Sequence, residues 1–511
     1  MLTLAGKGAL AGAAALAVLA AGLAPAAAAP SITWRACPDT DPVEGTALKG
    51  LECGDLKVPL DHANPGGPTV TLALTRAKHT ARRSQGVVLL NRGGPGAHGR
   101  DLAGGFQRGM PDDVGAAYDW IGFDPRGVGA SRPALTCDTS YQEPGRPRAD
   151  TVPADAAAEE AWKERAKRFA DDCGRRYGRL LPHMGTAAWI EDMEAIRRAL
   201  DADRLNYFGY SYGTYLGAAY ATRYPHRVRR MVLDSVVRPT GVWYPSQLDQ
   251  NVAFEHRIRA YFDWIARNDA RYRLGTSRAA VQRSYDRARA KLAKTPIDKR
   301  IGASELDDVF LGDGYGTRTW PAHAKALADY LRRRDPAGLR AAWQKPDAVE
   351  QNTFTMYNAV QCRDAVWPRD WSRWHRDATR QWRAGYRFET WGNVWYNAPC
   401  AFWSVPGGTP PEVGGVAAPL LIQATEDAAT PYAGAVETHG RFPASRLVVQ
   451  RGGGDHGVTF GGDACVDGAV AAYLRDGTMP ESRPGPDTTC TAPPPPTARQ
   501  AASPLADAAS P

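Results

Sequence analysis

The sequence predicts an α/β fold, built on a mostly parallel sheet that a large helical insertion interrupts. Two observations predict it. Short apolar runs alternate with helical segments over the first 239 residues and again after residue 405. Between them, residues 240–405 lose the strand pattern, become helical in character and hold 11 of the 15 tryptophans. We therefore expect an open sheet, with loops at the carboxyl ends of its strands, and a helical cap inserted into it.

The expected strands are apolar runs that end in Gly-rich or Pro-rich turns, a pattern typical of buried parallel strands. The run at 87–90, for example, leads into Asn-Arg-Gly-Gly-Pro-Gly, and the run at 206–208 leads into Gly-Tyr-Ser-Tyr-Gly. The six expected strands are 87–90, 120–123, 206–208, 231–233, 420–423 and 447–449. Helices are expected between them at about 156–177, 187–200 and 212–223.

These patterns divide the chain into five segments. The cap contains seven tryptophans within fewer than 40 residues, which form a stiff core, an aromatic lid over a cleft, or both. The segments are a signal peptide (1–29), the first part of the sheet domain (30–239), the helical cap (240–405), the second part of the sheet domain (406–480) and a Pro/Ala-rich tail (481–511).

Composition and charge exclude some classes of protein. The chain has 511 residues, of which 43% are hydrophobic and 23% are charged, as in a folded globular protein and unlike a disordered one. The formal net charge is +8, but the basic residues are scattered and the runs of arginine are short. We therefore expect no nucleic-acid partner.

The N-terminus has the features of a secretory signal. Lys7 is the one charged residue before Arg35, and an apolar run at 9–23 leads to Ala26–Ala29, which offers A-x-A cleavage sites. The run is shorter than the roughly 20 residues that span a bilayer. We expect a secreted protein with no stable membrane association after cleavage; an uncleaved N-terminal anchor is the alternative.

All eight cysteines follow the expected cleavage point, which fits an oxidising compartment. Eight cysteines allow 105 pairings. The simplest is pairing in order, because each bond then closes a local loop: 37–53, 137–173, 362–400 and 465–490. Without a C-x-x-C motif or a cluster of histidines beside a cysteine, we expect no metal site and no cofactor.

The segment Gly209–Gly213 fits the pattern G-x-S-x-G. An apolar strand precedes it and a Gly/Ala-rich helix follows, which is the context of a nucleophile elbow. In such an elbow the serine oxygen projects from a tight turn, and the glycines leave room for close approach. Ser211 is therefore the candidate nucleophile.

A serine nucleophile needs a base, and the base needs an acid that holds its tautomer. His456 is the histidine that lies both downstream of the elbow and in a loop after an expected strand. Asp427 follows the strand at 420–423, and the order Ser211, Asp427, His456 is the order expected of such a triad on this fold. Glu426 and Asp455 are the alternative acids.

The tetrahedral intermediate of acyl transfer needs hydrogen-bond donors for its oxyanion. The backbone N–H of Tyr212, directly after the nucleophile, is one candidate donor. The Gly-rich loop after the strand at 87–90 supplies the second, at Gly94. This loop lacks the Gly-Lys-Ser/Thr ending of a phosphate-binding loop.

Together these motifs resemble the α/β-hydrolase family of prolyl and tripeptidyl aminopeptidases, most of all the secreted bacterial tripeptidyl aminopeptidases. The resemblance runs from about residue 35 to about residue 490 and implies a helical cap inserted after the strand near Val232. Asn91-Arg92 stands where prolyl aminopeptidases commonly have histidine, which favours the tripeptidyl branch. The segments that carry the resemblance are 91–96, 122–131, 209–213, 430–432 and 455–457.

The resemblance implies a serine peptidase that removes tripeptides from peptides with a free N-terminus, and we expect a monomer. Such an enzyme needs a carboxylate for the substrate's amino group. Asp364 is the candidate, because a disulfide at Cys362 would fix its backbone near the aromatic-rich segment. The alternatives are a prolyl aminopeptidase, a secreted carboxylesterase or lipase on the same fold, and a non-catalytic binding protein.

Overall fold

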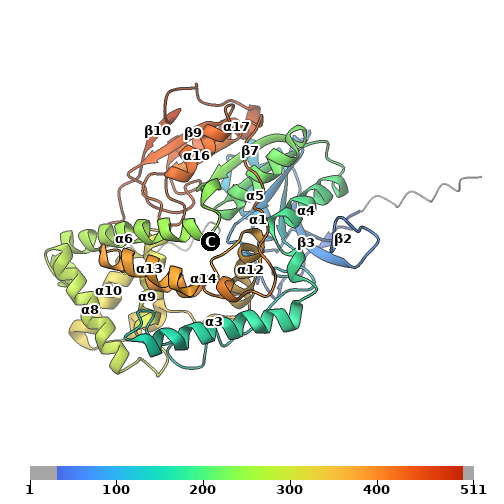
Figure 1. Cartoon of the computed structure of the whole chain (residues 1–511). Helices are drawn as coiled ribbons and strands as arrows, with labels where there is room; N and C mark the ends of the chain where they lie inside the picture. Colours follow the sequence, from blue (N-terminus) through green and yellow to red (C-terminus); the bar gives the residue numbers. More distant parts are fainter. Residues whose placement is uncertain (1–30, 499–511) are drawn as a thin grey trace, which may run out of the picture.

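The structure, a computed structural model, describes residues 31–498 and is built on one ten-stranded sheet (Figure 1). Its order is β1-β2-β3-β5-β4-β6-β7-β8-β9-β10. The pairs from β5 to β10 are parallel, and β1, β2 and β3 continue the sheet beyond β5 in antiparallel pairs. The mostly parallel α/β sheet expected from the sequence is therefore confirmed. The strands are β1 (Arg35–Ala36), β2 (Glu52–Pro59), β3 (Thr69–Ala77), β4 (Val87–Asn91), β5 (Asp119–Asp124), β6 (Leu205–Tyr210), β7 (Val228–Asp234), β8 (Leu420–Ala424), β9 (Arg446–Arg451) and β10 (Thr488–Thr491).

The central strands are apolar throughout because both faces of the sheet are covered. In β4, Leu89 belongs to one hydrophobic core, while Val88 and Leu90 belong to the other. A strand with both faces buried shows no polar alternation, which is why the sequence shows continuous apolar runs. One face packs against α1 (Leu102–Gly109) and α17 (Ala464–Asp476), and the other against α4 (Thr186–Ala199), α5 (Tyr212–Arg223) and α16 (Ala433–Arg441). The short α2 (Asp112–Gly115) follows α1.

The helical cap is inserted between β7 and β8. Figure 1 shows it packed beside the sheet domain. Its helices are α6 (Tyr244–Arg267), α7 (Asp269–Tyr272), α8 (Arg278–Lys294), α9 (Ala303–Tyr315), α10 (Trp320–Arg333), α11 (Ala337–Ala342), α12 (Ala348–Asp364), α13 (Trp371–Arg383), α14 (Thr390–Asn397) and α15 (Pro399–Phe402).

A second segment joins the cap from within the first part of the sheet domain. Helix α3 (Ala156–Tyr177), between β5 and β6, packs against α15 and runs along the lower edge of the cap in Figure 1. Trp162 of α3 stacks on Trp395 of α14, with the ring centroids 5.4 Å apart. The sequence places this helix among those of the sheet because it follows a strand, but its apolar face contacts the cap.

The clustered tryptophans form a core. Trp371 stacks on both Trp374 and Trp395, with interplanar angles of 10° and 17°. Trp367 stacks on the far side of Trp374 at 11°, and Trp391 stacks on Trp395 at 22°. None of these five lines the main cavity, so of the two roles expected from the sequence the structure supports the stiff core.

The four disulfides pair the cysteines in order, as expected: 37–53, 137–173, 362–400 and 465–490. Each joins elements that pack together. Cys137–Cys173 ties the loop after β5 to α3, and Cys362–Cys400 ties α12 to α15. The last bond ties α17 to β10.

The strand β10 corrects the expected tail at 481–511. Thr488–Thr491 pairs in parallel with β9, so the sheet domain continues past residue 480. The segment is polar, and the Cys465–Cys490 disulfide together with backbone hydrogen bonds holds it at the sheet edge. The expected signal peptide, residues 1–29, lies outside the described residues.

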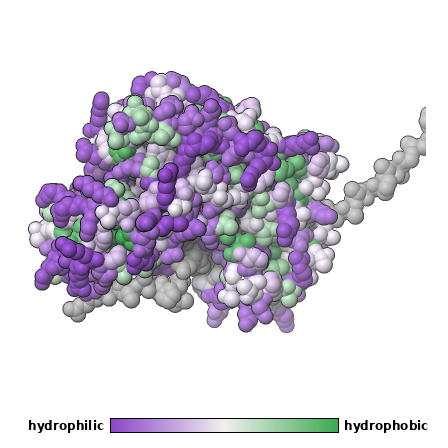
Figure 2. Space-filling model, turned by 90° about the horizontal axis from the view of Figure 1, so that it is seen from below, coloured by the Kyte–Doolittle hydropathy of each residue, from purple (hydrophilic) through white to green (hydrophobic). Residues whose placement is uncertain are grey.

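The described surface is mostly hydrophilic. The face in Figure 2 shows small, scattered groups of hydrophobic residues among polar ones. Among the described residues, the large hydrophobic side chains that are exposed are Val366, Tyr396, Val416 and Val436. No helix in residues 31–498 is both long and apolar enough to cross a membrane.

Candidate active site

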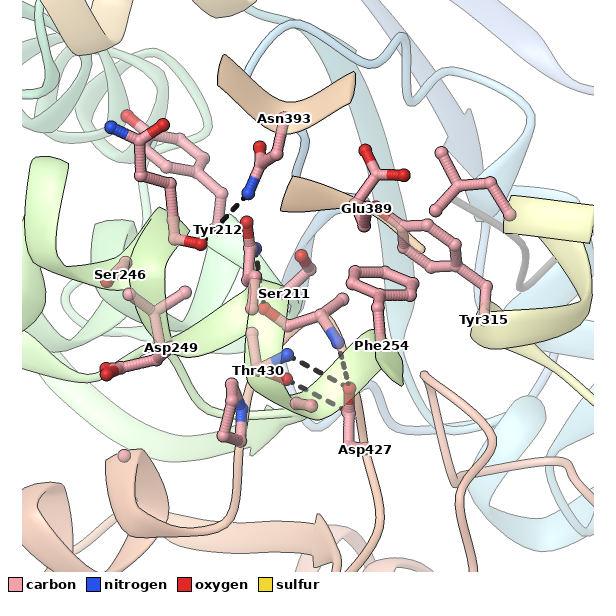
Figure 3. Close-up of a pocket in the computed structure, with 18 of the residues that line it drawn as sticks. Ser211, Tyr212, Ser246, Asp249, Phe254, Tyr315, Glu389, Asn393, Asp427 and Thr430 are labelled. Carbon is pink, nitrogen blue, oxygen red and sulfur yellow. Dashed lines mark hydrogen bonds between the residues drawn. The ribbon is translucent and has the colours of Figure 1, made fainter. Parts of the chain in front are cut away.

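Ser211 occupies the tight turn between β6 and α5. Its backbone has φ 55° and ψ −126°, in the region that non-glycine residues seldom adopt. The flanking glycines are required by space: a Cβ on Gly209 would lie 2.5 Å from the carbonyl oxygen of Gly213, and a Cβ on Gly213 would lie 2.8 Å from that of Asn91. The strand–turn–helix expected from G-x-S-x-G is therefore present, and Ser211 lines the main cavity (Figure 3).

His456 and Asp427 lie together beside this turn. The Nδ1 atom of His456 is 2.8 Å and 3.0 Å from the two carboxylate oxygens of Asp427. Both side chains are nearly inaccessible, at 2% and 0% exposed. With Nδ1–H donating to the carboxylate, the ring presents Nε2 as an acceptor.

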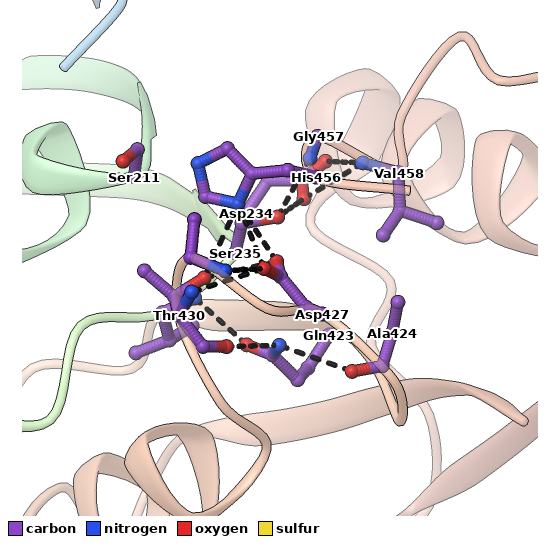
Figure 4. A network of polar contacts seen from close by, with 12 residues as sticks. Ser211, Asp234, Ser235, Gln423, Ala424, Asp427, Thr430, His456, Gly457 and Val458 are labelled. Atoms are coloured by element: carbon purple, nitrogen blue, oxygen red, sulfur yellow. Dashed lines mark hydrogen bonds and ion pairs between the residues drawn. The ribbon is translucent and has the colours of Figure 1, made fainter. Parts of the chain in front are cut away.

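The Nε2 atom of His456 faces Ser211. Figure 4 shows the imidazole between Ser211 and Asp427. Nε2 is buried and has no hydrogen-bond partner, so the contact with the Ser211 hydroxyl is longer than a hydrogen bond in this structure. Such contacts in substrate-free sites commonly tighten when substrate binds. The arrangement is the one that a serine nucleophile needs. Nε2 of His456 can accept the hydroxyl proton, and the Asp427 carboxylate binds the other side of the ring.

Asp427 is held as an acceptor by its own loop. Its Oδ1 accepts hydrogen bonds from the backbone N–H groups of Ala429 and Thr430 at 2.9 Å and 3.0 Å, and its Oδ2 accepts one from the Thr430 hydroxyl at 2.9 Å. The two alternative acids lie elsewhere. Glu426 is exposed, and Asp455 accepts hydrogen bonds from the backbone N–H and the hydroxyl of Thr317 in the cap.

Three groups that the sequence analysis missed hold the His456 loop. Asp234, at the end of β7, accepts hydrogen bonds from the N–H groups of Val458 and Thr459 at 3.0 Å and 2.7 Å. The Ser235 hydroxyl accepts one from Gly457 at 2.8 Å, and the Tyr315 carbonyl accepts one from His456 at 2.7 Å. The sequence signal for Asp234 was present, since it is a polar residue directly after a buried strand. No signal marks Tyr315, because its contact depends on how the cap packs.

The Gly-rich loop after β4 packs against the elbow. Gly93 has φ 109°, and a Cβ there would lie 2.6 Å from the Tyr210 carbonyl oxygen and 2.9 Å from Cβ of Ser211. Gly94 and Tyr212 both line the cavity beside Ser211. The N–H of Tyr212 is in the first turn of α5, where backbone donors lack intrahelical acceptors. The two backbone donors expected for the oxyanion are thus adjacent to the candidate nucleophile.

Asp364 lies outside the cavity, and this corrects the expectation that it binds a substrate amino group. The carboxylate is 4% exposed and accepts hydrogen bonds from the Thr186 N–H at 2.7 Å, the Thr186 hydroxyl at 2.6 Å and the Trp243 indole at 3.2 Å. The same Thr186 hydroxyl accepts from the Tyr212 phenol at 2.6 Å. Asp364 therefore links the end of α12 to the residue after the nucleophile, and both of its carboxylate oxygens already accept hydrogen bonds.

Burial of Asp364 predicts a pH dependence of stability. Burial raises the pKa of this carboxyl from 3.8 to about 6. Between these values the folded state binds the proton more tightly than the unfolded state does, so the free energy of unfolding falls as the pH rises. At about 1.4 kcal/mol per pKa unit, Asp364 lowers the free energy of unfolding by about 2 kcal/mol from pH 4 to pH 6.5.

Asp364→Asn should remove this contribution. Urea unfolding gives the free energy of unfolding of the wild type and the variant at pH 4 and at pH 6.5. The change between the two pH values should be smaller in the variant. Hydrogen bonds lost at both pH values cancel in that difference. An equal difference in both proteins would contradict the assignment.

Within the part of the chain that the structure describes, two groups of side chains are close enough to be considered for a metal. One contains Asp463 with Cys465 and Cys490, but these two cysteines form a disulfide. The other contains Glu44, His98 and Asp101. There His98 pairs with Glu44 at 2.9 Å and Asp101 pairs with Arg92, so the group is already a network of ion pairs beneath the Gly-rich loop.

The cavity has a volume of about 910 Å³ and lies between the sheet domain and the cap. Loops at the carboxyl ends of the strands contribute Gly94, Ser211 and Asp427. Cap helices α6, α9, α12 and α14 contribute the opposite wall. Such a volume is in the range of sites for small ligands, so the cavity fits a short peptide or a similar molecule.

Comparison with known proteins finds one matching family and several similar hydrolases. Residues 386–490 match the family described as TAP-like protein. The chain is 41% identical to the tripeptidyl aminopeptidase of Streptomyces lividans, over 91% of this chain and 87% of that protein. It is 32% identical to serine protease Hip1 of Mycobacterium tuberculosis, over 88% and 90% of the two chains, and 32% identical to carboxylesterase B of the same species, over 88% and 89%.

Proposed function

This chain belongs to the α/β-hydrolase family of the tripeptidyl aminopeptidases and is a serine peptidase, and we propose that it releases tripeptides from the free N-termini of peptides. The single observation that carries the proposed mechanism is the pairing of His456 with Asp427 beside the strained turn of Ser211. It leaves Nε2 as an acceptor toward the serine, which lines the cavity between the sheet domain and the cap.

The proposed chemistry is acyl transfer through a covalent intermediate. The Ser211 oxygen attacks the carbonyl carbon of the third residue while Nε2 of His456 takes the hydroxyl proton. The oxyanion accepts hydrogen bonds from the N–H groups of Gly94 and Tyr212. His456 then gives its proton to the leaving amine, and the peptide bond breaks. Water attacks the acyl-enzyme by the same steps, and Asp427 stabilises the imidazolium each time.

Two further observations support the finer parts of the proposal. The cap closes one side of the cavity, and the volume of about 910 Å³ suits a few residues of a peptide and not a folded chain. Four disulfides support a place of action in an oxidising compartment, which fits export from the cell.

One relative supports a second candidate function. The 32% identity to carboxylesterase B of Mycobacterium tuberculosis favours ester hydrolysis by the same groups. The two reactions share the nucleophile, base and oxyanion donors and differ in the leaving group, so substrate preference separates them.

A panel of chromogenic substrates tests the proposal. It contains aminoacyl, dipeptidyl and tripeptidyl 4-nitroanilides with free and acetylated amino termini, and p-nitrophenyl butyrate. We expect the free tripeptidyl amides to have the highest kcat/KM, by about tenfold or more over the shorter and the acetylated amides. Ester hydrolysis with negligible amide hydrolysis would contradict the peptidase function and support the esterase.

A further inference from the structure

One carboxylate in the cavity has no partner. Four acidic side chains line it, and two are paired: Asp427 with His456, and Asp249 with Arg238 at 2.9 Å. Glu426 is exposed to solvent at the rim. The fourth, Glu389, is half-buried, and within the described residues its carboxylate takes part in no hydrogen bond or ion pair.

The described residues around Glu389 supply no counter-ion for its carboxylate. Burial, together with the nearby carboxylates of Asp308 and Asp307, raises its pKa well above the usual range. The one cation that lowers this pKa is Arg148, which already forms ion pairs with Glu305 and Asp308. A carboxylate in such surroundings is costly to ionise unless a cation approaches it. A positively charged group on a bound ligand would therefore stabilise the ionised carboxylate of Glu389.

The neighbours of Glu389 suit an ammonium group. Tyr315, Tyr357 and Tyr396 line the same part of the cavity, and the Glu389 carboxylate adds to the rise that burial causes in the pKa of all three phenols. Phenol rings attract cations over their faces, and their oxygens accept hydrogen bonds. Figure 3 shows Glu389 beside Tyr315 on the cap side of the pocket that Ser211 lines.

The position of Glu389 is fixed by the cap. It is the residue before α14, and Asn393, one turn later on the same helix, donates hydrogen bonds to the Gln247 carbonyl and the Asn251 side chain of α6, each at 3.0 Å. The start of α14 is therefore tied to α6, which forms another wall of the cavity. Because its position is fixed, the Glu389 carboxylate can select substrates whose positive group reaches this point of the cavity.

We propose that Glu389 binds the protonated α-amino group of the peptide substrate and so restricts the enzyme to free N-termini. The proposal rests on the exopeptidase function above and assigns its amino-group site. An ammonium donates three hydrogen bonds. The carboxylate accepts at least one, and the surrounding phenol oxygens are available for the others.

The test compares Glu389→Gln and Glu389→Asp with the wild type on three substrates: a free tripeptidyl 4-nitroanilide, its N-acetylated form and p-nitrophenyl butyrate. Glu389→Gln should lower kcat/KM for the free tripeptide by about 10- to 100-fold, mainly through KM, because a charged hydrogen bond is lost. Hydrolysis of the acetylated amide and of the ester should stay near the wild-type rate. Glu389→Asp keeps the charge and should recover part of the preference for the free amine.

Glu426→Gln is the matched control, since it removes the same charge from the exposed rim. It should keep the wild-type preference for the free amine. If Glu389→Gln also keeps that preference, the role of Glu389 is overturned while the exopeptidase function stands. If the wild type hydrolyses the free and acetylated amides equally well, the exopeptidase function fails, and the role of Glu389 fails with it. Retained ester hydrolysis identifies a folded variant.

Discussion

Ser211→Ala should lower kcat for tripeptidyl amides by about 10⁴- to 10⁶-fold, the range seen when a serine nucleophile is removed. The loss is large because no other described side chain stands where the elbow presents Oγ, next to Nε2 of His456. The measurement is kcat on a free tripeptidyl 4-nitroanilide, together with labelling by a fluorophosphonate probe, which the variant should not show.

The same variant should fold normally. The Ser211 hydroxyl makes no hydrogen bond to any of residues 31–498, and alanine bears the same backbone strain at φ 55°. Its Tm should stay close to that of the wild type. Ser246→Ala is a suitable control, because Ser246 lines the same cavity from α6 and should be dispensable for acyl transfer. A Ser211→Ala enzyme that keeps more than about 1% of the wild-type kcat would exclude Ser211 as the nucleophile.

The sequence predicts the sheet-domain half of the site because that half depends on local rules. A buried strand followed by a turn with two glycines can place Ser211 in only a few ways. The carboxyl ends of parallel strands meet at one edge of the sheet, which brings the loops of Asp427 and His456 to the elbow. Ser211, Asp427 and His456 could be predicted because each lies in a loop that follows an apolar strand.

The cap half of the site could not be predicted in this way. Asp364 and Glu389 are both acidic residues in helical, Trp-rich sequence, and nothing local shows which of them faces the cavity. Their positions depend on how α12 and α14 pack. Asp364 contacts Thr186 of α4 and Trp243 outside the cavity, whereas Glu389 lines the cavity. Proximity to Cys362 in sequence fixed the backbone of Asp364 but not the direction of its side chain.

The cap also contributes to the arrangement of the catalytic loop. The Tyr315 carbonyl binds the N–H of His456, and Asp455 accepts hydrogen bonds from Thr317 and from Arg257 of α6. The residues on which the proposed base depends therefore come from both domains. Asp455, next to the histidine in sequence, has its carboxylate engaged by the cap, so it cannot at the same time hold the imidazole. Its role differs from that of Asp427 in a way that substitution can measure.

Asp427→Asn should lower kcat by about 10⁴-fold at neutral pH, because an amide at this place favours the wrong tautomer of the base. The carboxylamide NH₂ would donate to Nδ1 of His456, which would move the ring proton to Nε2, where it meets the serine hydroxyl as a donor. The backbone N–H groups of Ala429 and Thr430 would keep the asparagine oxygen in place, so the geometry should survive while the proton is misplaced.

The three acids near the site are distinguished by comparing their amide variants under the same conditions. Glu426→Gln and Asp455→Asn should lower kcat far less than Asp427→Asn does, since neither carboxylate contacts the imidazole. Asp455→Asn should instead weaken the link between cap and loop, which thermal unfolding measures as a lower Tm. A loss of kcat in Asp455→Asn equal to that in Asp427→Asn would mean that the position of the loop, and not the tautomer of His456, limits the reaction.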